Sequence, residues 1–271
     1  MQRLEITNHR IFDFQEEIFH AFDAKTLGAV AALALSVSLL AGCGSTAGSA
    51  AGSTAVSAVS EAASSEAADE NEAAAAQLMK DLTGSYQELW PVILADEHTQ
   101  TWLDDCTALV GEDNAEGAYE KLSSMVTGDV YGEDAVKAYA NGGGAYFCGF
   151  TQGLATLTFD GENSVISGTD KDGSTLFSHS YHYIGMEPVR GLYEFESDDA
   201  DSGEFTYFFL APDTSAETYH IEFRYGSDAD ALGQYDAGDY AYWLASGIST
   251  DCDQTMIDNC IQLFCTENLA G

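Results

Sequence analysis

The chain has few basic residues: 9 lysines and arginines stand against 45 aspartates and glutamates, for a formal net charge of −36 in 271 residues. A surface this acidic repels the phosphates of nucleic acids and anionic lipids and attracts cations. Nucleic-acid binding is therefore not expected. Aromatic residues are plentiful, with 14 Tyr, 14 Phe and 3 Trp. They are enough to build a core, so the acidity belongs to the surface.

Several chemical signatures are also missing. The six cysteines form no C-x-x-C pair and no zinc-finger spacing. The sequence has no nucleophile elbow, no H-E-x-x-H and no phosphate-binding loop, so an enzyme is not expected. Cys260 and Cys265 are five apart on one expected helix, which is a poor geometry for a bridge. A disulfide would suit an extracellular location, but the sequence assigns none.

Residues 1–42 are predicted to be a signal peptide with an acidic N-terminal extension. An apolar run over 27–40 has the length and the small residues of a signal-peptide core. It ends in Leu40-Ala41-Gly42-Cys43, which looks like a bacterial lipobox, whose cysteine is lipidated. The alternative is a buried helix that ends in a chance cysteine. We expect lipidation at Cys43 and a location on the outer side of the bacterial cell membrane.

Residues 43–76 read as a tether. They are rich in Ala, Ser and Gly and then in Glu, so they cannot bury enough apolar surface to fold. The lipid anchor is the only membrane contact that we expect. The remaining residues, 77–271, are predicted to form one domain.

The first part of this domain has helical periodicity. Apolar residues from Leu78 to Trp90 recur at three- and four-residue spacing, with Gly84 as a weak point. Further helices are predicted over 101–110, 115–126 and 132–140. Trp90 and Trp102 are expected in the core.

The rest of the domain is predicted to consist of short strands separated by turns. Consecutive strands with Asp-Gly turns and no helices between them favour an antiparallel meander or a small barrel. The fold class is therefore α+β and mostly β. The expected strands are 146–150, 154–159, 164–166, 175–184, 191–196, 205–210 and 219–226, followed by an aromatic loop over 236–247 and a closing helix over 253–267.

The segment from Tyr219 to Gly226 alternates strictly, and its polar face carries His220, Glu222 and Arg224. Histidine and glutamate two apart on a strand are roughly 7 Å apart, which two side chains can span to bind one ion. The alternative is that Glu222 pairs with Arg224 on a solvated face and that His220 has no role.

Several segments between Leu82 and the C-terminus resemble the ZinT (YodA-type) family. Residues 84–91, Gly-Ser-Tyr-Gln-Glu-Leu-Trp-Pro, are similar to the G-x-W-Q-S-V-x-P segment that opens these domains. Residues 181–185 and 190–196 resemble two of the family's strands, and 205–212 and 220–226 resemble the segment that carries its metal histidines. The resemblance implies a lipocalin-like (calycin-type) antiparallel β-barrel with N-terminal helices and a C-terminal helix. It also implies a zinc site, in proteins that recruit zinc outside the cytoplasm and pass it to importers.

The metal pattern departs from that of the family. The first family histidine falls on Phe208, which cannot bind a metal, and the H-x-H pair falls on His220 and Glu222. Glutamate still binds zinc, at about 2.0–2.2 Å. We expect His179 as a third ligand, because its strand face is aromatic and should line the barrel interior. The alternative for His179 is a core or surface role.

His182 lies on the opposite strand face, and His98 is expected on the surface. Together, the lipobox, the tether and the ZinT resemblance predict an extracytoplasmic lipoprotein that binds a divalent metal ion, with Zn2+ as the expected cation, for recruitment or homeostasis. A metal-importer substrate-binding protein is the candidate partner. The alternative is a lipocalin-like small-ligand-binding or surface adhesion module with a degenerate metal site, which Phe208 favours.

Overall fold

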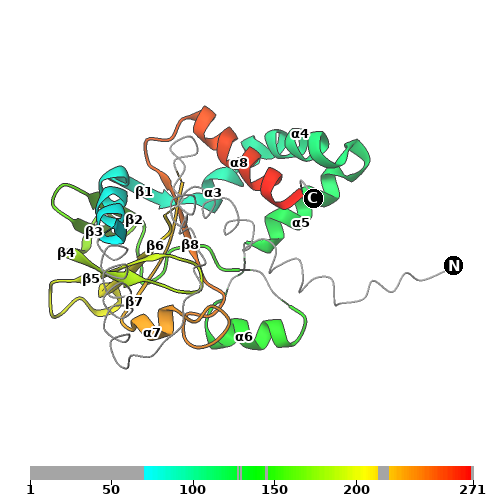
Figure 1. Cartoon of the computed structure of the whole chain (residues 1–271). Helices are drawn as coiled ribbons and strands as arrows, with labels where there is room; N and C mark the ends of the chain where they lie inside the picture. The colour runs from blue at the N-terminus through cyan, green and yellow to red at the C-terminus, as the bar shows by residue number, and fades with distance from the viewer. Residues whose placement is uncertain (1–69, 127, 129, 144–145, 213–219, 270–271) are drawn as a thin grey trace, which may run out of the picture. The chain divides into compact units, whose positions relative to one another are not determined.

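Eight antiparallel strands close into a barrel in which each strand pairs with the next in sequence and β8 pairs with β1 (Figure 1). The structure is a computed structural model that describes residues 70–126, 128, 130–143, 146–212 and 220–269. An eight-stranded up-and-down barrel is the lipocalin architecture, so the expected fold class is confirmed. The strands are β1 (Gly84–Glu88), β2 (Thr156–Asp160), β3 (Val165–Thr169), β4 (Thr175–Met186), β5 (Tyr193–Ser197), β6 (Tyr207–Leu210), β7 (His220–Gly226) and β8 (Ala245–Ser249).

The helices lie mostly before the second strand and at the end of the chain. Residues 70–81 are helical and precede β1. The others are α3 (Leu89–Ile93), η1 (Asp96–His98), α4 (Thr99–Val110), α5 (Glu112–Met125), α6 (Glu133–Ala140), η2 (Gly203–Phe205), α7 (Ala229–Leu232) and α8 (Gln254–Leu269). Within the part of the chain that the structure describes, no helix has both the length and the apolarity that crossing a membrane requires.

Aromatic side chains fill the interior of the barrel. Phe208 is fully buried, and its ring centroid lies 5.4 Å from those of both Tyr181 and Tyr225. Phe177 stacks on Phe205 at 4.0 Å. Because successive strand residues point to opposite faces, the interior takes every second residue of each strand. The barrel therefore has a packed aromatic core.

The helix over 70–81 belongs to the same core. Ala75, Leu78 and Met79 are buried in the cluster that includes the barrel aromatics. The β2–β3 turn approaches this helix closely, because a Cβ added at Gly161 would lie only 2.1 Å from the Met79 carbonyl oxygen. A side chain at 161 would force the turn away from the helix.

A second apolar centre lies among α3, α4, α5 and α8. Trp102 is fully buried, and its indole N–H donates to the Ile93 carbonyl at 2.7 Å. The ring of Phe264 lies 4.8 Å from that of Trp90 and 5.8 Å from that of Trp102. The expected core positions of the two tryptophans are therefore confirmed.

Two expectations for the barrel were wrong. Gly84–Glu88, expected to be helical, is strand β1, and Ala245–Ser249, expected at the end of a loop, is strand β8. Leu82, Tyr86 and Leu89 have helical spacing by coincidence, since only Tyr86 lies in the strand. Pairing of β1 with both β2 and β8 satisfies its backbone on both sides and outweighs local preference.

The strand expected over 146–150 is reduced to an isolated parallel bridge between Phe147 and Trp243. The other expected helices and strands are present, with bounds that differ by a few residues. Helix α5 starts after Gly111, and the side-chain amide of Asn114 donates to the Val110 carbonyl at 3.0 Å.

Candidate functional site

His220, Glu222 and Arg224 share the outer face of β7, whereas Ile221, Phe223 and Tyr225 belong to the barrel core. The alternation expected from the sequence is therefore confirmed. The outer face is covered rather than solvated. Arg224 is fully buried and His220 is only 9% exposed, while Glu222 is half-buried.

His220 starts β7, opposite Ile248 of β8. Burial lowers the pKa of His220 from 6.5 to about 4. The imidazole is therefore neutral at pH 7, which is the form that binds a metal ion. Glu222 lies two residues further on the same face, opposite Ser246.

Cys148 lies close enough to Glu222 for the carboxylate to affect its ionisation. Burial first, and the charge of Glu222 second, raise the pKa of the Cys148 thiol. Without a metal ion, the thiol is therefore protonated at neutral pH.

Arg224 has a structural role in the connection between β7 and β8. Its guanidinium donates to the carbonyl oxygens of Leu232, Gln234 and Tyr240. It also lies 4.4 Å from the centre of the Tyr235 ring, which Arg190 contacts at 4.1 Å. The alternative of a solvated face formed by Glu222 and Arg224 is therefore wrong.

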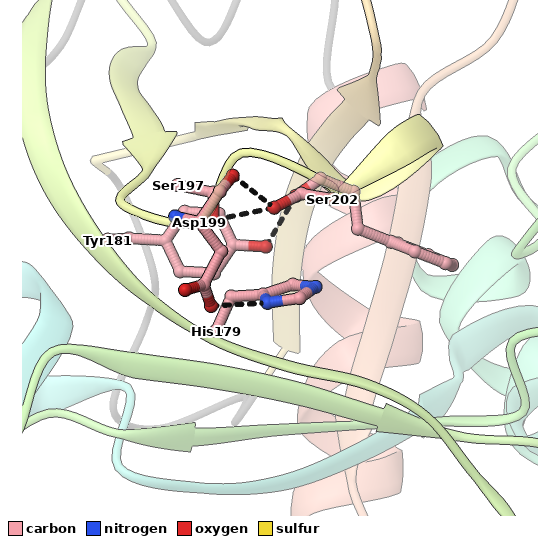
Figure 2. A network of polar contacts seen from close by, with 6 residues as sticks. His179, Tyr181, Ser197, Asp199 and Ser202 are labelled. Atoms are coloured by element: carbon pink, nitrogen blue, oxygen red, sulfur yellow. Dashed lines mark hydrogen bonds and ion pairs between the residues drawn. The ribbon is translucent and has the colours of Figure 1, made fainter.

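His179 lies on the inner face of β4, as its aromatic neighbours predicted. Its ring centroid is 5.8 Å from that of Phe177 and 6.5 Å from that of Tyr181. Figure 2 shows that its Nδ1 atom meets the Asp199 carboxylate, with 2.7 Å between Nδ1 and Oδ2. A carboxylate bound at one ring nitrogen fixes the orientation of the imidazole and leaves Nε2 available to a ligand.

The turn that carries Asp199 is held by its own hydrogen bonds (Figure 2). The Ser202 hydroxyl oxygen lies within hydrogen-bond distance of Ser197 Oγ, at 2.8 Å, and of the Asp199 carbonyl oxygen, at 2.9 Å. The Asp199 amide donates to Ser197 Oγ at 3.1 Å. The carboxylate partner of His179 is therefore fixed by the turn that follows β5.

The barrel wall separates His179 from the other two candidate ligands. His179 faces the interior, His220 and Glu222 face outward, and β5 and β6 lie between their strands. Phe208, the position of the first family histidine, also faces the interior. Its ring centroid lies 5.9 Å from that of Phe177. Over 70–269, apart from its undescribed gaps, the structure contains no group of three or more His, Cys, Asp or Glu arranged to hold a metal ion.

The two remaining described histidines lie elsewhere. His98 was expected on the surface, but it is only 4% exposed, and its Nδ1 lies 3.3 Å from the amide nitrogen of Gln254 at the start of α8. The surface prediction was therefore wrong, and the start of α8 contributes a contact to this buried histidine. His182 lies on the outer face of β4, is exposed, and has its Nδ1 2.8 Å from Asp198 Oδ1.

The sequence did not reveal that Asp198 and Asp199 are histidine partners. Adjacent aspartates after β5 place one carboxylate at each of the two histidines of β4. The signal was an Asp-Asp pair at the end of a strand that forms a hairpin with the histidine-bearing strand. Cys43, the expected lipidation site, lies outside the described residues.

No protein-family model and no curated protein sequence matches the chain. Among solved structures, the chain is similar to the Zn(II)-bound ZinT-like domain of Streptococcus pneumoniae AdcA, with 13% identity and a TM-score of 0.42 over 68% of this chain and 88% of that one. It is also similar to Zn(II)-bound AdcA from Streptococcus pneumoniae, with 12% identity and a TM-score of 0.40 over 68% of this chain and 34% of that one. The pairing of the strands itself establishes the barrel.

Proposed function

We propose that the chain is an exported lipoprotein whose ZinT-like domain binds a divalent metal ion, with zinc as the expected cation, through His220 and Glu222. The observation that carries this proposal is the pairing of a buried, neutral imidazole with a carboxylate on one covered face of β7. An imidazole nitrogen and a carboxylate oxygen are both zinc ligands. Among the residues that the structure describes, no third His, Cys, Asp or Glu joins them in a metal-binding group.

The charge of the site suits a cation as cargo. The Glu222 carboxylate offsets one of the two positive charges, and the neutral His220 adds none. The strongly acidic surface gathers cations around the domain. One oxygen donor in place of a nitrogen makes the site less selective for zinc over manganese or calcium, because oxygen donors suit harder ions.

His179 is assigned no part in this site, since the barrel wall lies between it and His220. Its Nδ1 atom instead pairs with the Asp199 carboxylate. The resemblance to ZinT domains supports recruitment of the cation and its transfer to a metal-importer substrate-binding protein. The aromatic packing of the barrel interior favours a cation site over the alternative of a lipocalin-like cavity.

The test is a zinc titration of the metal-free full chain by calorimetry, combined with thermal unfolding. Zinc that binds only the folded state adds about 2.7 kcal/mol of stability at a hundredfold excess over the dissociation constant. We expect His220→Ala to remove most of this gain and the heat of binding. Because His220 is buried, Glu222→Gln serves as a second variant that keeps the size and shape of the side chain.

His182→Ala is the matched control, since this exposed histidine also has a carboxylate partner but lies on another strand. It should bind zinc as the wild type does. His179→Ala tests the interior pair and should also leave binding at β7 intact. If His220→Ala and Glu222→Gln both bind zinc as tightly as the wild type, the acidic surface collects the ion and the proposed site is wrong.

A further inference from the structure

Two cysteines far apart in the sequence meet between the helices outside the barrel. Cys106 of α4 and Cys265 of α8 are fully buried, and their Sγ atoms lie 3.9 Å apart. The sequence did not indicate this pair, because 159 residues separate the two cysteines. Neither residue takes part in the cation site proposed above.

The packing of α4 against α8 fixes this encounter. Trp102 lies one helical turn before Cys106 on the same face of α4, and its ring contacts that of Phe264, the neighbour of Cys265. Figure 1 shows α4 and α8 side by side, and the two helices are in contact along this interface. The two thiols are therefore held together by the surrounding core.

We infer that Cys106 and Cys265 form a disulfide bond in the exported protein. This inference rests on the export in the proposed function, because such bonds persist in oxidising compartments. The Sγ atoms must close from 3.9 Å to about 2.05 Å for the bond to form. The bridge would join α4, which precedes strands β2 to β8 in the chain, to α8, which follows them.

The oxidant is a second disulfide, carried by a protein oxidoreductase or a small molecule. The thiolate of one cysteine attacks that disulfide, forms a mixed disulfide with the oxidant and releases the first thiol of the oxidant. The other cysteine then attacks the sulfur of the first cysteine in the mixed disulfide and releases the second thiol of the oxidant. Two hydrogens leave the chain, one Sγ–Sγ bond forms, and the oxidant is reduced to two thiols.

The burial of the pair determines when this exchange occurs. Burial raises the pKa of both thiols, so little thiolate exists in the folded domain, and neither sulfur is exposed. The exchange therefore takes place before α8 has packed on α4. Once formed, the bond is shielded from solution thiols by the same packing.

The geometry of α8 does not favour a bridge between Cys260 and Cys265. Cys260 and Cys265 lie on the same helix, and at 3.6 residues per turn a separation of five points them in different directions. Cys265 instead faces α4. One bridge leaves Cys148, Cys252 and Cys260 as thiols.

The experiment maps disulfides by mass spectrometry without reduction. The full chain is purified from the cells that export it, with thiols blocked during lysis. Chymotrypsin cleaves after Phe264 and so separates Cys260 from Cys265. We expect a peptide pair joined through Cys106 and Cys265, lighter by two hydrogen atoms than the sum of its parts. Cys106→Ser and Cys265→Ser should each abolish it, and Cys252→Ser should leave it unchanged.

A second experiment, on refolded protein, tests whether the disulfide forms independently of whether cells export the protein. The denatured full chain, carrying Cys43→Ala, is refolded in a glutathione redox buffer and mapped in the same way. Absence of the Cys106–Cys265 pair after refolding would overturn the disulfide. A pair that forms on refolding but is absent from cells would overturn export and leave the pairing supported. A pair between Cys265 and another cysteine in both experiments would also refute the inference.

Discussion

Acidification should weaken the folded domain through His220. Burial lowers the pKa of this imidazole from 6.5 to about 4, so the folded state resists its protonation. In the unfolded chain the imidazole takes up a proton near pH 6.5. Between these two values the unfolded state binds more protons, and folding stability therefore falls as the pH falls from 6.5 to 4. Below pH 4 this residue causes no further loss.

The size of the effect follows from the two pKa values. At about 1.4 kcal/mol for each pH unit, the difference between 6.5 and about 4 corresponds to a total of about 3 kcal/mol. At pH 5, where the unfolded imidazole is almost fully charged and the folded one is still mostly neutral, we expect a loss of about 2 kcal/mol relative to pH 8. Metal binding should survive to pH 5 for the same reason, because the folded imidazole stays neutral there.

The assay is urea unfolding at pH 8 and pH 5 in the presence of a chelator. The many carboxylates also titrate in this range, so the wild type is compared with His220→Asn, whose amide does not titrate. The wild type should lose about 2 kcal/mol more than the variant on acidification. Equal losses in the two proteins would show that His220 is not buried as a neutral group.

Two further predictions concern the folded loop and the membrane anchor. Arg224→Met should lower the free energy of unfolding by about 3 kcal/mol, measured by urea unfolding, because two buried carbonyl groups and one partly buried carbonyl group lose their donor. Arg224→Lys should restore only part of this loss, since an ammonium group lacks the planar fork. Unchanged stability of both variants would refute the role given to Arg224. Cys43→Ala should move the protein from the membrane fraction to the soluble fraction, as immunoblots of fractionated cells would show, whereas retention after signal processing would contradict lipidation at Cys43.

The middle of the barrel could be predicted from sequence because its strands alternate. Tyr219 to Gly226 alternates strictly, and the face that carries Ile221, Phe223 and Tyr225 is indeed the core face. The same reasoning placed His179 correctly on the inner face of β4 through Tyr181. A period-two pattern depends only on the residues of the strand itself, so it can be read from the sequence without knowing which strands pair.

The first and last strands could not be found in this way. β8 reads Ala-Ser-Gly-Ile-Ser and contains one β-branched hydrophobic residue, while β1 has a single large apolar side chain, Tyr86. Both are strands because they pair with each other and with neighbours at a distance in the sequence. Such pairing energy does not appear in local composition.

The candidate site was predicted only in part for a similar reason. Alternation shows that His220 and Glu222 share a face, but the sequence does not show what covers that face. Burial of Arg224 under the segment from Leu232 to Tyr240 makes the outer face of β7 an interior surface. His179 and His220 are separated because the side chain of His179 faces the barrel interior, whereas that of His220 faces outward.

Closure of the barrel through β1 and β8 also constrains how the chain can fold during export. Gln87 pairs with Ile248, so the first strand of the barrel cannot complete its pairing until the last strand, β8, has been made. In the export proposed here, the N-terminal part of the domain emerges first and has an open β-edge on β1 until β8 arrives. Open edges recruit other strands, and distant pairings form slowly. A chain truncated before Ala245 would therefore keep two unpaired strand edges, one on β1 and one on β7. We expect such a chain to aggregate or to be degraded by the quality-control proteases of its compartment.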